Sequence, residues 1–348
     1  MTIRRILLGR RTLLAASAAT LARPALSQRR LIPAATQLGW LRNGEFAAII
    51  VAEAQGYFEA EGIQHRIMDG GPGRNPIPTV AVGQAQFGLA TSSSHLIAAK
   101  VARDPVDVIA VGTLYQQGPA ALLRLANPGD PEPTPRDLDG KSVGVQAGSE
   151  YLVRALARVN GVNPDRVRIV TAQANAEPLL VGRVDYFLGW VTNQAYQIEQ
   201  EIAKPDAPAN LRGKTWQGIR FGRWGVRSYA DTIFTTTRFA QDNPEVVQGY
   251  LRAVQRAVRF ILDNPAESVT VVARFPGQVE SAERLTWRWN VQNPLYVSDA
   301  TNRSGLLFME DAVWSENSAV LREANEIPRD VAPADIMTNR FLPAPRPA

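Results

Sequence analysis

The sequence predicts an α/β protein with two lobes joined by two chain crossings. Apolar segments of strand length alternate with segments of helical periodicity along most of the chain, which is typical of sheets covered by helices. The length of 348 residues is enough for two domains of ordinary size. A β-rich run, TIFTTT at 232–237, is followed mostly by helical segments. We therefore expect the chain to enter a second lobe at about Gln117 and to return at this run.

The first lobe is expected to comprise residues 28–117 and 233–348. Its predicted strands are 31–38, 63–68, 87–90 and 106–113, and its first helices are 45–61, 77–82 and 93–103. The helical segments 244–263, 266–274, 280–293 and 307–324 follow the return crossing and should pack on this lobe. Because strands alternate with helices, we expect parallel pairing of the strands.

The second lobe, residues 118–232, repeats the pattern of strand, glycine turn and helix. Its predicted strands are 120–125, 141–145, 168–170 and 186–188, and its predicted helices are 150–160, 178–181 and 193–203.

Residues 1–27 have the layout of a signal peptide. Paired arginines at 10–11 precede the mild apolar run 15–22, and small residues occupy positions 25 and 27. The apolar run is about half the length that a membrane-spanning helix needs, which disfavours the alternative of an N-terminal anchor. We expect export to the periplasm by a twin-arginine-like or general secretory signal.

Composition excludes several classes of site. The chain has no cysteine, so disulfides, thiolate nucleophiles and cysteine metal sites are excluded, and only His65 and His95 could supply an imidazole. Five arginines in residues 1–27 account for the whole formal charge of +5, so residues 28–348 carry no net charge. We therefore expect no metal and no nucleic-acid partner.

Motifs for catalysis are also absent from the sequence. There is no G-x-S-x-G or H-E-x-x-H, and Gly140-Lys141-Ser142 lacks the upstream glycine of a phosphate loop because position 135 is proline. No carboxylate pair stands out as an acid–base couple. These observations predict a protein that is not an enzyme and needs no cofactor.

The stretch 69–97 contains the first candidate ligand site. A glycine–proline loop supplies Gly71, Pro72, Gly73, Arg74 and Asn75, and its backbone could approach a ligand closely; the alternative is an ordinary strand-to-helix turn.

A serine run closes the same stretch. Ser92, Ser93 and Ser94 begin a helix, where hydroxyl and N–H groups could hold a polar group; the alternative is simple N-capping. His95 is more simply read as a structural residue.

Aromatic residues near strand ends could bind a flat ring. Trp40 and Trp190 follow predicted strands, and Tyr115 lies at the expected crossing; the alternative for each is a place in the core. Two such faces would sandwich a heterocycle, each contributing about 1–3 kcal/mol. The polar neighbours of these rings complete this part of the predicted site: Asn43, Gln116, Thr192 and Asn193.

Several segments together resemble one family. The segment AEAQGYFEAEGI at 52–63 resembles the A-x-x-x-G-Y-F-x-x-E-G segment of ABC-importer periplasmic substrate-binding proteins. The branch is the one that handles sulfonates, nitrate, taurine, thiamine pyrimidine precursors and riboflavin. Four more segments match the sequence pattern of this family: 70–73, 82–88, 137–145 and 184–186. The resemblance covers roughly residues 32–340.

The resemblance implies a type II periplasmic-binding-protein fold, in which two α/β lobes close over a ligand in the cleft. It also implies that the second lobe's helix start faces the serine run, so that Gln146, Ser149 or Tyr151 could close over the ligand; the alternative is a plain helix cap. The GGPG loop with Trp40 and the residues 192–194 is most similar to the pyrimidine-precursor branch.

The predicted function is therefore capture of a small molecule outside the cytoplasm and its delivery to the permease and ATPase of an ABC importer. We expect a monomer that binds a thiamine-pyrimidine-like or other aromatic heterocycle. The first alternative is a binder of sulfonate, nitrate or taurine anions. A second is a pyrimidine-synthase-like enzyme on the same fold, although the cysteine-rich iron motif of the eukaryotic enzymes is missing. A third is an extracytoplasmic sensor.

Overall fold

The structure of the protein is a computed structural model that describes residues 31–71 and 74–344. Residues 32–348 form one compact unit. The predicted signal peptide, residues 1–27, lies outside the described residues. No helix among the described residues is both long enough and apolar enough to cross a membrane.

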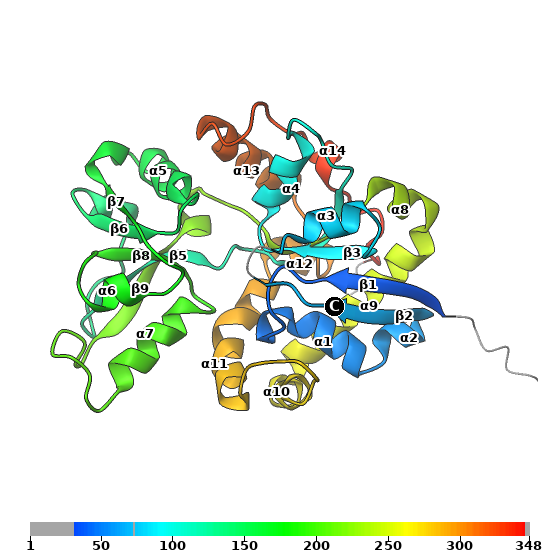
Figure 1. Cartoon of the computed structure of the whole chain (residues 1–348), viewed down its shortest axis with the longest axis horizontal. Helices are drawn as coiled ribbons and strands as arrows, with labels where there is room; N and C mark the ends of the chain where they lie inside the picture. Colours follow the sequence, from blue (N-terminus) through cyan, green and yellow to red (C-terminus); the bar gives the residue numbers. More distant parts are fainter. Residues whose placement is uncertain (1–30, 72–73, 345–348) are drawn as a thin grey trace, which may run out of the picture. The chain divides into compact units, whose positions relative to one another are not determined.

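The compact unit contains two five-stranded sheets. In Figure 1, β1–β3 of the first sheet and β5–β9 of the second are labelled in different parts of the molecule. The first has the order β2-β1-β3-β10-β4. Its strands are β1 (Ile32–Gln37), β2 (Ile63–Met68), β3 (Phe87–Ala90), β4 (Ile109–Tyr115) and β10 (Ala230–Thr235). The β1 strand pairs in parallel with β2 and β3, whereas β10 runs antiparallel to β3 and β4.

The second sheet repeats this arrangement in the order β7-β6-β8-β5-β9. Its strands are β5 (Ala120–Ala126), β6 (Ser142–Val145), β7 (Arg168–Thr171), β8 (Tyr186–Trp190) and β9 (Thr215–Arg220). Here β6 pairs in parallel with β7 and β8, and β5 runs antiparallel to β8 and β9.

The prediction of parallel pairing is therefore wrong for β5 and β10. Each of these strands enters its sheet directly from the other sheet, without a helix of its own sheet before it. Strand–helix alternation gives the direction only of strands joined by a helix that packs back on the same sheet. The β9 strand was also missed by the sequence analysis.

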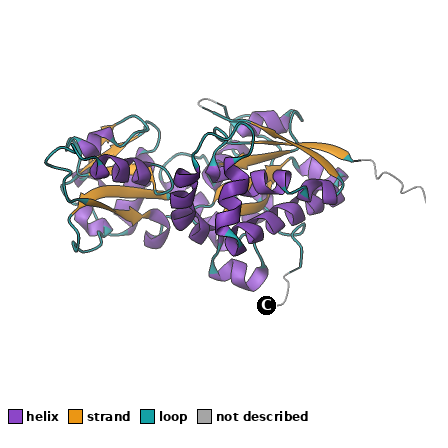
Figure 2. Ribbon diagram, turned by 90° about the horizontal axis from the view of Figure 1, so that it is seen from below, coloured by secondary structure: helices purple, strands orange, loops and turns teal. Residues whose placement is uncertain are grey.

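Helices cover both faces of the first sheet (Figures 1 and 2). One face carries α1 (Ala47–Ala54), α2 (Tyr57–Ala60), α9 (Pro244–Asp263), α10 (Pro265–Ala273) and α11 (Ala282–Gln292). The other carries α3 (Pro76–Ala81), α4 (Ser93–Lys100), α13 (Asp311–Glu323) and α14 (Pro333–Ile336). Helices α8 (Thr237–Asp242) and α12 (Asp299–Ser304) and the 3-10 turns η1 (Gly44–Phe46) and η5 (Asn293–Tyr296) complete this part.

The second sheet is covered in the same way. Helix α5 (Glu150–Val159) packs on one face, and α6 (Glu177–Leu180) and α7 (Gln194–Ala203) pack on the other. The 3-10 turns η2 (Pro135–Leu138), η3 (Pro164–Arg166) and η4 (Phe221–Trp224) lie between these elements.

The predicted helix 45–61 is interrupted in the structure. Gly56 has a φ of +67° and separates α1 from α2, while Gly62, at φ +80°, ends α2 before β2. The backbone leaves the helical conformation at both positions, and other residues would be strained in this left-handed region. Gly56 therefore divides the predicted helix, and Gly62 ends it. Residues 116–119 connect β4 to β5, and residues 225–229 connect η4 to β10. The lobe limits 28–117 with 233–348, and 118–232, stay a prediction.

Candidate ligand-binding site

A cavity of about 390 Å³ lies between residues of the two sheets. The first lobe contributes residues from the start of α4, together with α13 and the loop after it. The second contributes the start of α5, the end of β8, and η4. The polar and aromatic members of the lining are Thr91, Ser92, Ser94, His95, Ser149, Tyr151, Trp190, Phe221, Ser228, Tyr229 and Glu326.

The start of α4 forms one wall of this cavity. Ser92 is the N-cap, and its Oγ accepts from the Ser94 N–H (3.2 Å). The Ser93 N–H donates to the Tyr229 carbonyl oxygen (3.0 Å), and the His95 N–H donates to the Ser92 carbonyl oxygen (3.1 Å). All three N–H groups of the first turn therefore have protein partners. This helix start presents hydroxyl groups to the cavity rather than free N–H groups.

Buried Asn317 on α13 fixes two of these serines. The Ser93 Oγ donates to Asn317 Oδ1 (2.9 Å), and Asn317 Nδ2 donates to the Ser94 Oγ (3.0 Å). Ser93 also accepts from the Tyr229 N–H (3.1 Å). Ser92 and Ser94 line the cavity, whereas Ser93 is not among the lining residues. Ser93 thus anchors the helix to α13 and to the start of β10.

The second lobe supplies the opposite wall. Ser149 precedes α5 and makes no side-chain cap, so its hydroxyl is available to a ligand. Trp190 is the last residue of β8. Its backbone N–H donates to Gln194 Oε1 (2.8 Å), and this bond fixes the backbone that carries the indole. Tyr151 and Phe221 bring two more rings to the lining. Tyr151 was a candidate from the sequence, whereas Phe221 was missed because it directly follows β9, the strand that the sequence did not predict.

The charge of the cavity is low. Neither lysine nor arginine is among its lining residues, and Glu326 is the one carboxylate among them. Desolvation in the cavity wall lowers the pKa of His95, although this residue keeps part of its surface exposed to solvent. The walls therefore suit a ligand that is uncharged or positively charged and that has hydrogen-bond donors.

The predicted glycine loop and its neighbours lie outside this lining. The Trp40 side chain is 40% exposed, and Asn43 and Asn75 cap η1 and α3 through their side-chain oxygens. Gly71 and Arg74 form an isolated bridge with each other. Pro72 and Gly73 lie outside the described residues.

Five other predicted site residues also lie outside the lining. Tyr115 is fully buried, and its hydroxyl donates to the Glu45 carbonyl oxygen (3.1 Å). Gln116 donates to the Phe308 carbonyl oxygen (3.1 Å), and Gln146 donates to that of Leu188 (3.2 Å). The remaining two follow β8: Thr192 is buried, and Asn193 is exposed at the start of α7.

A buried carboxyl pair was not visible in the sequence. Glu45 is 6% exposed and Asp231 is fully buried, although the two residues lie far apart along the chain. Burial raises the pKa of Glu45 to about 7, and burial together with the charge of Glu45 raises the pKa of Asp231 well above its usual value. The expectation that the chain has no carboxylate pair is therefore wrong. Only the fold brings Glu45 and Asp231 together.

A second network of polar side chains links half-buried Glu53 to the buried residues His65 and Thr36 by hydrogen bonds. His65 Nδ1 lies 2.5 Å from Glu53 Oε2, and His65 Nε2 lies 2.8 Å from Thr36 Oγ1. The order of carboxylate, imidazole and hydroxyl is that of a catalytic triad. Thr36 is fully buried, however, and its hydroxyl also bonds to the Tyr250 hydroxyl (2.7 Å). The arrangement therefore stabilises the core between β1, β2 and α9.

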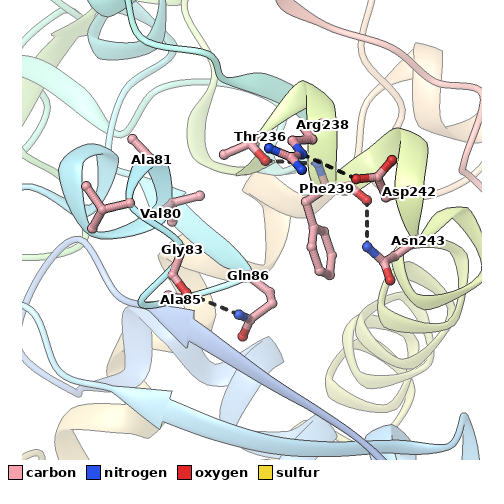
Figure 3. Close-up of a pocket in the computed structure, with 11 residues that line it drawn as sticks. Val80, Ala81, Gly83, Ala85, Gln86, Thr236, Arg238, Phe239, Asp242 and Asn243 are labelled. Atoms are coloured by element: carbon pink, nitrogen blue, oxygen red, sulfur yellow. Dashed lines mark hydrogen bonds and ion pairs between the residues drawn. The ribbon is translucent and has the colours of Figure 1, made fainter.

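Another cavity, of about 310 Å³, lies between α3 and α8 of the first lobe (Figure 3). Its polar side chains bond within the cavity wall: Arg238 pairs with Asp242 (3.5 Å), and Asn243 donates to the Phe239 carbonyl oxygen (3.3 Å). None of the predicted site residues lines it. The cavity between the two sheets is therefore the better candidate site. Across the described ranges, no group of three or more His, Asp or Glu side chains is placed to hold a metal ion.

The two sheets and the helices on their faces define a periplasmic-binding-protein fold, and the candidate cavity lies between the two sheets. The chain belongs to the NMT1/THI5-like family, whose model matches residues 43–268. The family resemblance and the predicted fold class are thus confirmed.

Two curated relatives match most of the chain. A 4-amino-5-hydroxymethyl-2-methylpyrimidine phosphate synthase of Legionella pneumophila is 24% identical, over 88% of this chain and 91% of its own. The riboflavin-binding protein RibY of Chloroflexus aurantiacus is 24% identical, over 92% of this chain and 88% of its own. Among solved structures, the periplasmic aliphatic sulphonate-binding protein SsuA of Escherichia coli has a TM-score of 0.62 at 16% identity, over 87% of this chain and 96% of its own. That structural likeness shows the fold alone.

The prediction that the chain is not an enzyme is contradicted by these relatives. The Legionella protein and two similar proteins of Saccharomyces cerevisiae are named as phosphate synthases, so the family includes enzymes. The prediction rested on the missing cysteines and the apparent lack of a carboxylate pair. Buried Glu45 and Asp231 show that titratable groups with shifted pKa values arise here without cysteine.

Proposed function

We propose that this protein binds a small aromatic heterocycle, uncharged or cationic, in the cavity between the two sheets and delivers it to an ABC importer. The observation that carries the proposal is the lining, which combines the rings of Tyr151, Trp190, Phe221 and Tyr229 with the hydroxyls of Ser92, Ser94 and Ser149. Apolar walls with a few convergent polar groups are typical of small-molecule sites.

The lining offers a flat ligand both stacking and hydrogen bonds. Stacking on Trp190 and on a second ring would contribute about 1–3 kcal/mol each, and hydrogen bonds from the serine hydroxyls about 0.5–1.5 kcal/mol each. The cost of association is subtracted from this gain, so the affinity depends on how many of these contacts one ligand makes at once.

A sulfonate, nitrate or taurine ligand is the less favoured alternative. Such anions are usually held by arginine, lysine or the free N–H groups of a helix N-terminus. The lining contains no arginine or lysine, and the first three N–H groups of α4 are bonded within the protein. Glu326 would also repel an anion.

The comparisons support a heterocyclic ligand and a role in import. One relative is named as riboflavin-binding, and others are named as synthases of a pyrimidine phosphate. Riboflavin and the pyrimidine are both flat heterocycles. Several solved structures with this fold are named as binding components of ABC import systems. The sulphonate-binding neighbour is named as periplasmic, which agrees with the expectation that residues 1–27 direct export.

Synthesis of a pyrimidine phosphate is a second candidate function. It is favoured by the names of the curated relatives and by His95, a titratable side chain within the lining. Release of a pyrimidine phosphate by the purified protein, or a mass change at His65 or His95, would establish the enzyme.

A thermal-shift screen tests the proposed ligand class. The purified protein is melted with 4-amino-5-hydroxymethyl-2-methylpyrimidine, riboflavin, ethanesulfonate, taurine and nitrate, each at the same concentration. We expect stabilisation by at least one heterocycle, because a ligand that binds only the folded state raises the melting temperature. Stabilisation by the anions alone would overturn the proposal.

A further inference from the structure

The contact between α7 of the second lobe and α11 of the first lies outside the candidate cavity. Trp287 on α11 packs against the hydrophobic core of the second sheet. Its indole N–H donates to Glu199 Oε2 on α7 (2.5 Å), and its ring meets Tyr196 at 5.0 Å between centroids. None of these three residues lines the cavity.

Arg284 makes the second connection across the same interface. Its Nη2 donates to the Thr192 carbonyl oxygen (2.7 Å), and its guanidinium lies 3.9 Å from the Tyr196 ring centroid. The Nε of the same guanidinium donates to Glu280 Oε1 (3.2 Å). Thr192 lies two residues after Trp190, so this bond fixes the turn that carries the cavity's indole.

We propose that Arg284 and Trp287 are positioning residues that stabilise the closed arrangement of the two lobes and thereby set the affinity of the cavity for its ligand. The part concerning affinity rests on the proposed function. The cavity has walls from both lobes, so the ligand finds all its partners only when the lobes are together. The apparent affinity falls in proportion to the fraction of molecules in that arrangement.

The chain offers a matched control at the same carboxylate. Trp216 on β9 belongs to the second lobe, and its indole N–H donates to Glu199 Oε1 (2.6 Å). Trp287→Phe and Trp216→Phe each remove one indole donor from Glu199, but only the first removes a bond between lobes. Because a hydrogen bond to a charged group is lost, Trp287→Phe should weaken ligand binding about tenfold, whereas Trp216→Phe should change it less than about twofold.

A distance measurement tests the interface without any ligand. The chain has no cysteine, so Val82→Cys and Val181→Cys, at exposed positions of the first and second lobe, allow two specific spin labels. In the full protein without ligand, Trp287→Phe and Arg284→Lys should broaden the distance distribution between the labels, and Trp216→Phe should leave it unchanged. Circular dichroism confirms that each variant is folded.

The possible outcomes separate the two proposals. Unchanged distances in both folded Trp287→Phe and Arg284→Lys overturn the role of the interface, whichever ligand binds. Changed distances in a protein that binds no heterocycle support the interface and overturn the proposed ligand class. Tighter binding by Trp287→Phe would show that the interface stabilises an open arrangement, which also overturns the inference.

Discussion

Replacement of Glu45 by glutamine should remove a large part of the pH dependence of stability. In the folded protein, Glu45 lies buried beside Asp231, with Arg288 and Glu280 acting on its charge. Burial raises its pKa from 4.5 to about 7, and one pKa unit corresponds to about 1.36 kcal/mol. The difference of about 2.5 units amounts to about 3 kcal/mol for this one group.

The sign of the effect follows from proton binding. Because the pKa of Glu45 is higher in the folded state, the folded protein binds the proton more tightly than the unfolded chain does. The contribution of Glu45 to stability is fully present below about pH 4.5 and is lost as the pH rises through about 7. Asp231, whose pKa is also raised, acts in the same direction.

The assay is urea unfolding at pH 5 and pH 8 for the wild type, Glu45→Gln and a surface control, Glu177→Gln. Glu177 is exposed on α6 and pairs only loosely with Arg183 (3.8 Å). From pH 5 to pH 8, the wild type and the control should lose about 2–3 kcal/mol more of the free energy of unfolding than Glu45→Gln. An equal loss in all three proteins would refute the assignment of a buried, protonated Glu45.

Three further substitutions test the site and its support. Trp190→Ala should weaken heterocycle binding about 5- to 150-fold by calorimetry, because about 1–3 kcal/mol of stacking is lost; Trp40→Ala, outside the lining, should not, and equal losses would contradict the site. Asn317→Ala should lower the free energy of unfolding by about 1–3 kcal/mol, since buried Ser93 and Ser94 lose their partner. Thr36→Val should cost a similar amount in urea unfolding, and an unchanged midpoint would contradict the buried network with His65.

Long helices and the short strands that pair in parallel could be predicted from the sequence. The predicted helix 244–263 matches α9, because proline at its first position and a continuous apolar stripe define it. Ser92 was recognised as a possible N-cap, and it caps α4. These features depend on neighbours within a few residues, which a single sequence contains.

Features that depend on contacts distant in sequence were not readable. The antiparallel direction of β5 and β10 follows from how the chain passes between sheets, and no local pattern encodes it. Trp287 and Trp289 lie on one helix, yet Trp289 is buried in the first lobe's core and Trp287 reaches the second lobe. Likewise, only the fold brings Phe221 to the same cavity as Trp190.

A crystal structure of the protein with a bound heterocycle tests the central claim most directly. Crystals are grown with the heterocycle that raises the melting temperature most, and the ligand is located by its electron density. We expect a flat ring against Trp190, with polar atoms in hydrogen-bond range of Ser94 or Ser149. Density that lies away from this cavity, or an anion held there by arginine side chains, would contradict the account.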